Sequence, residues 1–433
     1  MNFICDNINK NDVSHLTFAG LDTVELAKEY GTPLYLLDVD RVREKCRLYI
    51  SSLKKHLGDN VLPLYASKAL SFVGIYRVLK EENMGIDVVS GGEFYTALKA
   101  GFPSDKVYFH GNNKTDSELK FAIDNNIGCI VVDNLNELNF VDEYCNKISK
   151  KQKILLRVTP GIDPHTFKAV VTGNVDSKFG FAIETGQAEK ITIEILKKKN
   201  VDFYGYHCHI GSQIFDSEPF YDAAKIMTGF IANMQDKYGI NVRELNLGGG
   251  IGVRYVEDQP CLDIDTILGE IATHIKNACL EAKIDIPRIL IEPGRSIVAD
   301  SGMTLYTCGG LKEITGYKKY LPIDGGMSDN PRYALYQAEY TVYNASRIDD
   351  SADTVCDVVG KCCESGDIIQ ENVSIAFPKK GDIIAVCTTG AYNYSMASNY
   401  NKIPRPPIVG ISNGTAEILV KRESYEDLIS NEL

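Results

Sequence analysis

Leu64-Tyr-Ala-Ser-Lys-Ala69 closes a short apolar run that begins at Val61. The run predicts a buried strand, and we expect it to start late because Pro63 cannot donate a ladder hydrogen bond. Lys68 then stands at the carboxyl end of the strand, before a helical pattern that starts near Phe72. A lysine in this place can attack a carbonyl group. Taken alone, it is better explained as a solvated lysine in a turn.

Seven further strand-like segments follow, separated by helical patterns. We expect the eight strands at 62–65, 85–89, 107–110, 129–132, 154–158, 202–207, 244–247 and 288–291. The helical patterns include 93–100, 117–125, 134–149, 188–199 and 217–238. This alternation predicts an α/β fold, a (β/α)8 TIM-type barrel. A doubly wound sheet would alternate too, but the barrel is favoured because chemically interesting residues come from nearly every strand end.

The pattern changes after about residue 300. Short strand-like segments separated by Gly, Pro, Asn and Asp lie at 304–315, 320–324, 339–343, 353–359 and 382–387. They predict a second, mostly β domain of sandwich or barrel type. Residues 32–38 form one more expected strand, which joins this domain before a helix at 39–56. We therefore predict a barrel at 39–300 and a discontinuous β domain at 1–38 and 301–433.

Composition limits the possible partners and the compartment. The chain has 433 residues and a net charge of −12, which argues against nucleic acid as a partner. No apolar run is long enough to span a bilayer, and the first residues do not resemble a signal peptide. Twelve cysteines are scattered without metal-type spacing, which predicts a cytoplasmic protein with reduced thiols.

Four stretches after Lys68 place glycines or polar side chains at expected strand ends. They are Gly85-Ile-Asp-Val-Val-Ser-Gly-Gly-Glu93, His207-Cys-His-Ile-Gly-Ser-Gln213, Leu247-Gly-Gly-Gly-Ile-Gly252 and Glu292-Pro-Gly-Arg295. Each suits one part of pyridoxal 5'-phosphate (PLP), which Lys68 would hold covalently. In isolation, each stretch is better explained as an ordinary turn or a buried strand end.

The glycine run suits the phosphate, because clustered glycines let backbone N–H groups approach an anion closely. Its spacing is not that of a dinucleotide-binding fingerprint. Ser212 adds a hydroxyl, and Tyr392 in Gly390-Ala-Tyr392 adds a phenol. His209 is a candidate for stacking on the cofactor ring. Glu292 would favour the protonated pyridine nitrogen and so a strong electron sink.

We do not expect a metal at His207 and His209, because no carboxylate with ligand geometry is evident nearby. Asp87 and Glu93 are expected near the Lys68 amine, where they would tune its charge. Arg157 is expected to support the ring or its neighbours.

The β domain supplies candidates for substrate binding. Arg332 and Tyr336 are four residues apart, so on a helix they would project from one face and, with Arg295, hold a carboxylate. Cys362-Cys-Glu-Ser-Gly-Asp367 combines thiols, carboxylates and a turn. A thiol near a cationic cofactor can donate a proton, although buried filler is the commoner role of such a pair.

Taken together, these motifs resemble the fold-type III PLP-dependent decarboxylases, and among them the diaminopimelate decarboxylases of lysine biosynthesis. The resemblance covers about residues 32–415. It is carried by Tyr65-Ala-Ser-Lys-Ala69, Pro160-Gly-Ile-Asp-Pro-His165, Asp176-Ser-Lys-Phe-Gly180, His209-Ile-Gly-Ser-Gln213, Glu292-Pro-Gly-Arg295, Cys363-Glu-Ser-Gly-Asp367 and Gly390-Ala-Tyr392.

The resemblance implies a role for each matching residue. Lys68 is implied as the PLP lysine, His209 as the ring-stacking residue and Cys363 as the proton donor. The remaining implied groups are the phosphate ligands Ser212, Gly249, Gly250 and Tyr392, the pyridine partner Glu292, and the substrate ligands Arg295, Arg332, Tyr336 and Glu364. We also count Asp87, Gly294 and Arg295 as cofactor-binding and Tyr392 as substrate-binding. The family further implies a homodimer whose Cys-Glu-Ser-Gly-Asp segment reaches the neighbouring subunit's site.

The implied reaction is decarboxylation of meso-2,6-diaminopimelate to L-lysine and CO2. A related decarboxylase for D-lysine, D-ornithine or another diamino acid is an alternative. A catalytically silent PLP-binding regulator is a second alternative, from a different class of protein. Lys68, Cys363 and Glu364 are all present, which argues against silence.

Overall fold

The structure is a computed structural model that describes residues 3–162 and 177–433. Asp163, Pro164, His165 and Asp176, which belong to two of the quoted motifs, lie outside the described residues. The chain divides into two compact units. The first, called the β unit below, consists of Met1–Arg43, Val253–Cys261 and Arg295–Leu433. The second, the barrel unit, consists of Glu44–Gly252 and Leu262–Gly294. The domain boundaries at residues 39 and 300 stay a prediction.

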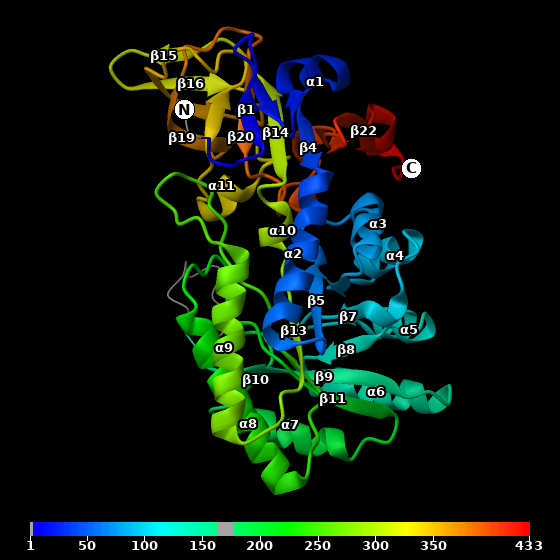
Figure 1. Cartoon of the computed structure of the whole chain (residues 1–433). Coiled ribbons are helices and arrows are strands. Elements are labelled where there is room, and N and C mark those ends of the chain that lie inside the picture. The colour runs from blue at the N-terminus through cyan, green and yellow to red at the C-terminus, as the bar shows by residue number, and fades with distance from the viewer. Residues whose placement is uncertain (1–2, 163–176) are drawn as a thin grey trace. The chain divides into compact units, whose positions relative to one another are not determined.

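The barrel unit contains a closed ring of parallel strands, which confirms the predicted fold class (Figure 1). In ring order, the barrel strands found in the described residues are β5 (Val61–Ala66), β6 (Gly85–Val88), β7 (Val107–Phe109), β8 (Cys129–Val132), β9 (Gln152–Thr159), β11 (Val201–His207), β12 (Glu244–Asn246) and β13 (Arg288–Ile291). β13 pairs with β5 and closes the ring, while the short β10 (Phe181–Ala182) pairs with β9. Because the strands are parallel, their carboxyl ends meet at one rim.

Pro63 does not delay β5, contrary to our expectation. Val61, Leu62 and Pro63 pair with β13, and pairing with β6 begins only at Leu64. The strand therefore includes Pro63. Pro63 lies in the part of β5 that precedes its pairing with β6, where a missing N–H is tolerated.

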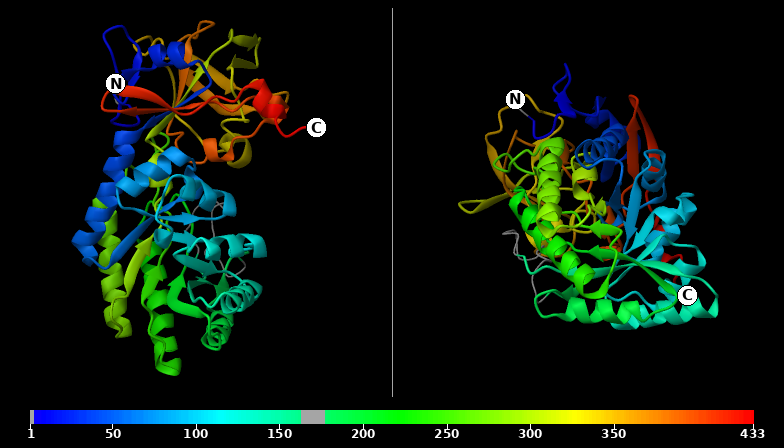
Figure 2. Two further views of the ribbon diagram at one scale, coloured as in Figure 1. Left: turned by 90° about the vertical axis from the view of Figure 1, so that its right-hand side faces the viewer. Right: turned by 60° about the horizontal axis from the view of Figure 1, so that its bottom comes forward.

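Helices surround the barrel strands (Figure 2). They are α2 (Val39–Leu57), α3 (Val73–Glu81), α4 (Gly91–Lys99), α5 (Asp116–Asp124), α6 (Leu135–Lys147), α7 (Gln187–Leu196), α8 (Glu218–Tyr238) and α9 (Ile264–Ala282). Several begin at side-chain caps: Ser90 accepts from the Glu93 N–H, and Thr115 forms a capping box with Glu118. Such caps satisfy N–H groups that have no partner inside the helix.

The β unit is built from three sheets within the described residues. The largest has the order β17 (Val342–Asn344), β20 (Ile383–Cys387), β14 (Gly302–Thr307), β4 (Leu34–Asp38), β21 (Ile408–Ser412) and β22 (Thr415–Val420). The second has the order β15 (Lys312–Ile314), β16 (Lys318–Pro322), β18 (Thr354–Val359) and β19 (Ile368–Ile375), and the third β1 (Ile8–Lys10), β2 (Leu16–Phe18) and β3 (Leu21–Asp22). The expected strand at 32–38 is β4, which pairs with β14 and β21, as predicted.

The β unit also departs from the prediction. The single strand expected at 304–315 is two strands, β14 and β15, because Gly309-Gly310 interrupts it. Residue patterns did not predict β1, β2, β3, β19, β21 or β22. The β unit also carries α1 (Thr23–Tyr30), α10 (Arg295–Val298), α11 (Arg332–Tyr336) and α12 (Tyr425–Ile429).

Among the described helices, none has both the length and the apolar character of a membrane span.

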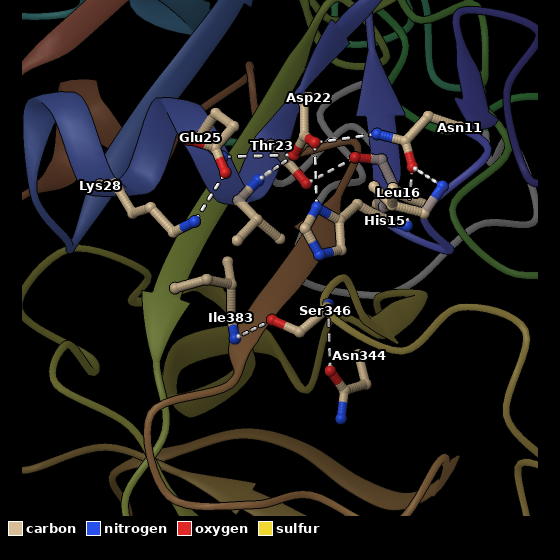
Figure 3. Close-up of polar contacts among 12 residues, drawn as sticks. Asn11, His15, Leu16, Asp22, Thr23, Glu25, Lys28, Asn344, Ser346 and Ile383 are labelled. Carbon is tan, nitrogen blue, oxygen red and sulfur yellow. Dashed lines mark hydrogen bonds and ion pairs between the residues drawn. The ribbon is translucent and has the colours of Figure 1, made fainter.

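Figure 3 shows how α1 begins. The Asp22 carboxylate accepts from the backbone N–H groups of Val24 and Glu25, and it also contacts Asn11 and His15. Each of these polar groups therefore has a partner in the cap, so the cluster is a structural feature of the unit.

The barrel interior holds a small apolar cluster, and we predict that Leu155→Ala in this cluster destabilises the protein. Leu155 is fully buried, so truncation leaves a cavity that costs about 2–5 kcal/mol of unfolding free energy. Leu280→Ala is the matched control, because Leu280 on α9 is 77% exposed. Urea unfolding of the two variants would contradict the packing described here if both lost the same stability.

Candidate active site

The Lys68 turn and the Glu292 turn are packed together at the rim of the barrel. Lys68 lies in a short 3-10 turn directly after β5, and its side chain is exposed. The backbone N–H of Ala66 donates to the Pro293 carbonyl over 3.0 Å. A Cβ on Gly294 would lie 2.8 Å from that of Ala66, so only glycine permits this close approach.

Glu292 directly follows β13, and side chains from three other strand ends approach it. Asn246 Nδ2 donates to Glu292 Oε1 over 2.7 Å. His110 Nε2 lies 3.0 Å and His207 Nε2 lies 3.4 Å from the same oxygen, although neither ring is aligned for a full hydrogen bond. The Gly248 N–H donates to Asn246 Oδ1 over 2.9 Å, which orients the amide so that its NH2 group faces the carboxylate.

The pKa values of two buried carboxylates at this rim are shifted in opposite directions. Burial raises the pKa of Asp87 well above its ordinary value, the charge of Glu292 raises it further, and Lys68 opposes the rise. Burial also acts to raise the pKa of Glu292, but His110 and His207 bring it well below its ordinary value. Burial lowers the pKa of His207 to about 4, so at neutral pH this ring acts on Glu292 through its N–H dipole. Opposed pKa shifts of neighbouring groups are typical of active sites.

The glycine run after β12 is held against neighbouring backbone. A Cβ on Gly249 would lie 2.1 Å from the Glu292 carbonyl oxygen, and one on Gly250 would lie 2.6 Å from the Gly211 carbonyl oxygen. Gly250 also has φ +128°, which side-chain-bearing residues rarely adopt. The run therefore needs glycine for its path, and such a path leaves N–H groups accessible to an anion.

His209 contacts the glycine run, and the charge of Lys68 acts on its ring. Its Nδ1 accepts from the Gly249 N–H over 3.3 Å. Burial lowers the pKa of His209 well below its ordinary value, and the charges of Lys68 and Arg157 lower it further. A neutral imidazole in this place is suited to lie against an aromatic ring.

The other candidates in the barrel unit support this rim. Glu93 Oε2 accepts from the Val89 N–H over 2.7 Å, and burial raises the pKa of Glu93 while Lys68 lowers it. Arg157 Nε lies 3.8 Å from Asp133 Oδ1. The roles expected of Glu93, Arg157 and Ser212 stay predictions.

In the β unit, two buried arginines share a cage of phenols. Arg295 on α10 donates to the Tyr255 hydroxyl over 2.9 Å. Arg332 on α11 donates to the Tyr340 hydroxyl over 3.0 Å, and its guanidinium carbon lies 5.4 Å from the Tyr255 ring centre. Burial raises the pKa of Tyr255, but Arg295 and Arg332 reverse this and leave it below its ordinary value. The cage is therefore a strongly cationic environment.

Tyr392 joins this cage through a strained turn. Its ring centre lies 4.7 Å from the Arg295 guanidinium carbon and 5.7 Å from that of Arg332. Tyr392 has φ +67°, and a Cβ on Gly390 would lie 1.8 Å from the Val298 carbonyl oxygen. Such strain is typical of residues that the surrounding structure holds for a function.

Three predicted site residues of the β unit, Tyr336, Cys363 and Glu364, do not lie in the buried cage of arginines and tyrosines. Tyr336 is helical, as expected, but it is 46% exposed while Arg332 is 7% exposed. They therefore do not share one buried face. Cys363 and Glu364 lie in an exposed turn after β18.

Sequence reasoning gave no role to His110, Asn246, Tyr255 or Tyr340, and it judged a carboxylate near His207 to be absent. The structure corrects this second point, because Glu292 approaches His207 from another strand. His110 follows β7 and Asn246 ends β12, so the rule that singled out Lys68 also applies to them. No such signal marks the two tyrosines.

The rim of the barrel unit fits PLP. It offers an amine for the aldehyde, an ionised carboxylate for the pyridine nitrogen, a neutral imidazole for the ring face and a glycine run for the phosphate. Ser67 Oγ is buried and has no hydrogen-bond partner among the described residues, which leaves one further donor for a bound group.

Comparison with known proteins agrees with this geometry. Residues 39–299 match the family described as pyridoxal-dependent decarboxylase, pyridoxal binding domain. The chain is 44% identical to diaminopimelate decarboxylase of Bacillus subtilis (strain 168), covering 100% of this chain and 98% of that protein. The chain belongs to the diaminopimelate decarboxylase family. PLP is accordingly its cofactor, and it is a decarboxylase.

Further relatives show the same full-length likeness. Diaminopimelate decarboxylase of Staphylococcus aureus (strain COL) is 42% identical, over 98% of this chain and 99% of that protein. The crystal structure of the enzyme from M. jannaschii with L-lysine has a TM-score of 0.91 at 32% identity and covers 100% of this chain. The family likeness therefore includes both units.

We predict that Gly249→Ala weakens PLP retention by an order of magnitude or more, because its Cβ would collide with the Glu292 carbonyl and displace the loop. Gly229→Ala is the control, since a Cβ there meets nothing within 4 Å. Retention is measured by the absorbance of the holoenzyme after dialysis. Equal retention by the two variants would show that the loop does not hold the cofactor.

Proposed function

We propose that this chain decarboxylates meso-2,6-diaminopimelate to L-lysine and CO2, the last step of lysine biosynthesis. The observation that carries the choice of substrate is the arginine pair of the β unit. Arg332 is 7% exposed, and no carboxylate among the described residues forms an ion pair with it. A buried guanidinium of this kind is suited to a carboxylate that arrives with the substrate. Lysine and ornithine lack that second carboxylate.

The residues of the barrel unit prepare the cofactor end. When bound, PLP supplies an electron-withdrawing ring that stabilises the carbanion left by loss of CO2. We assign Lys68 to covalent attachment, Glu292 to the pyridine nitrogen and His209 to the ring face. Asp87, whose pKa is raised by burial and lowered by the charge of Lys68, tunes the charge around the amine.

The remaining assignments concern the substrate. Arg295 and Arg332 bind the distal carboxylate, and Glu364 takes the distal ammonium. Tyr392 and Tyr336 complete the pocket through their phenols. Cys363 delivers a proton to the α-carbon after CO2 has left, and Lys68 then releases the product amine.

The substrate assignment predicts strong discrimination. With lysine bound, the Arg332 guanidinium would be desolvated without a carboxylate, so kcat/KM for lysine or ornithine should fall below that for diaminopimelate by a factor on the order of 10⁴. Arg332→Gln should lower kcat/KM for diaminopimelate by about 100-fold, with PLP retention unchanged. CO2 release from meso-diaminopimelate, lysine, ornithine and arginine measures both effects.

Arg347→Gln is the matched control, because Arg347 lies in the same unit but is paired with Asp382. Comparable kcat/KM for lysine and diaminopimelate would overturn the substrate assignment and leave the decarboxylase reaction intact.

We further propose a two-fold dimer with shared active sites. The turn that holds Cys363 and Glu364 is exposed, yet its backbone is fixed. Asp367 accepts from the Cys362 N–H over 2.7 Å, and the Cys363 N–H donates to Asn401 over 2.8 Å. A rigid, exposed turn with reactive side chains is suited to enter the site of a second copy, and a two-fold axis would present it twice.

Mixing Lys68→Ala with Cys363→Ala subunits tests the shared site. Each variant alone should be inactive. Random pairing makes half of the dimers mixed, each with one intact site, so about a quarter of wild-type activity should return. Demonstrated subunit exchange without any return of activity would show that each site belongs to one chain.

We place the enzyme in the cytoplasm. None of the twelve cysteines, all of which lie in the described residues, forms a disulfide, and most of them are buried. This pattern is usual in a reducing compartment.

A further inference from the structure

The neighbouring side chains approach only one of the two carboxylate oxygens of Glu292. Asn246, His110 and His207 all approach Oε1, at 2.7, 3.0 and 3.4 Å. In the part of the chain that the structure describes, no side chain donates to Oε2. Each approaching group comes from a different strand end, so closure of the barrel fixes their convergence on one oxygen.

The geometry points to different roles for the two oxygens of this carboxylate. His110 and His207 are positioning residues that hold Glu292 through Oε1, so that Oε2 remains for the pyridine nitrogen of PLP. This inference rests on the placement of PLP in the proposed function. It assigns roles to two histidines that neither stack on the ring nor touch the substrate.

The tautomers follow from the acceptor. Asn246 presents its NH2 group to Oε1, because its own oxygen is occupied by the Gly248 N–H. Glu292 Oε1 is therefore an acceptor, and both histidines carry a proton on the nitrogen that faces it. His207 is 1% exposed and neither of its ring nitrogens has an aligned partner, so a small rotation brings its Nε2–H onto Oε1.

A metal ion is the competing interpretation, because ligand atoms of His110, His207 and Glu292 lie within 4.8 Å of one another. The Asn246 amide argues against it. Its NH2 group lies 2.7 Å from Oε1, in the space from which a cation would approach. A carboxylate surrounded by N–H donors is suited to remain an anion.

Two forms of the cofactor test the inference. Apoenzyme is titrated with PLP and with the analogue in which C–H replaces the pyridine nitrogen, and equilibrium dialysis gives the two Kd values. His110→Leu and His207→Leu remove the donors, whereas the corresponding Gln variants retain an N–H. We expect the Leu variants to weaken PLP by about tenfold or more and to leave the Kd of the analogue unchanged. The Gln variants should recover most of the loss.

His56→Leu is the matched control, since His56 also lies beside a carboxylate, 3.2 Å from Asp265, but away from this rim. Equal weakening of both ligands, including complete loss through misfolding, would assign the histidines a merely structural role and overturn the inference. Unchanged affinity for both ligands would overturn it as well.

Glu292→Gln separates this inference from the proposed function. If this variant loses PLP selectively but the histidine variants do not, the contact between Glu292 and the pyridine nitrogen stands and the histidine role falls. If Glu292→Gln binds PLP and the analogue as the wild type does, the placement of PLP itself is wrong. Zinc-dependent loss of PLP binding that disappears in His207→Leu would favour the metal interpretation.

Discussion

Closure of the parallel barrel is the constraint on which the site depends. β13 pairs with β5, so the last barrel strand in the sequence lies beside the first barrel strand. This pairing brings the Glu292 turn against the Lys68 turn, two segments separated by more than two hundred residues. Gly294 makes the contact possible because it has no Cβ to meet Ala66. Without closure, the carboxylate and the amine would belong to opposite edges of an open sheet.

The electrostatics of the rim follow from the same geometry. Burial acts to raise the pKa of both Asp87 and Glu292, but for Glu292 the neighbouring His110 and His207 outweigh burial and lower it. The outcome is that the pKa values of two carboxylates at the same rim are shifted in opposite directions. A site that must hold a positively charged heterocycle needs this arrangement, since two buried carboxylates could not both stay ionised at low energy.

The β unit also holds buried charged groups, but these are cations. Two guanidinium groups are buried close together, and phenol oxygens and ring faces stabilise them. Phenols are weak partners for a guanidinium compared with a carboxylate, so the cage keeps Arg332 in place without neutralising it. Because phenols are weak hydrogen-bond partners for a guanidinium, the cage is suited to a ligand that brings its own negative charge.

Much of the fold could be predicted from residue patterns alone. Apolar runs placed all eight barrel strands, and Lys68, Glu292 and the glycine run stood out because polar or glycine residues at strand ends face the rim. Strands β19, β21 and β22 escaped detection, because short antiparallel strands owe their stability to partners distant in the sequence. The opposite environments of Arg332 and Tyr336 were equally hidden, since helical spacing does not tell which face is buried.

Local sequence therefore determined which residues carry chemistry and which strand ends bear them. Only the tertiary structure decided which of those ends meet. It set His110, His207 and Asn246 around one oxygen of Glu292 and placed Tyr255 beside Arg295. The physical reason is that pKa values and hydrogen bonds depend on distances of a few ångströms, and the packing of distant segments sets those distances.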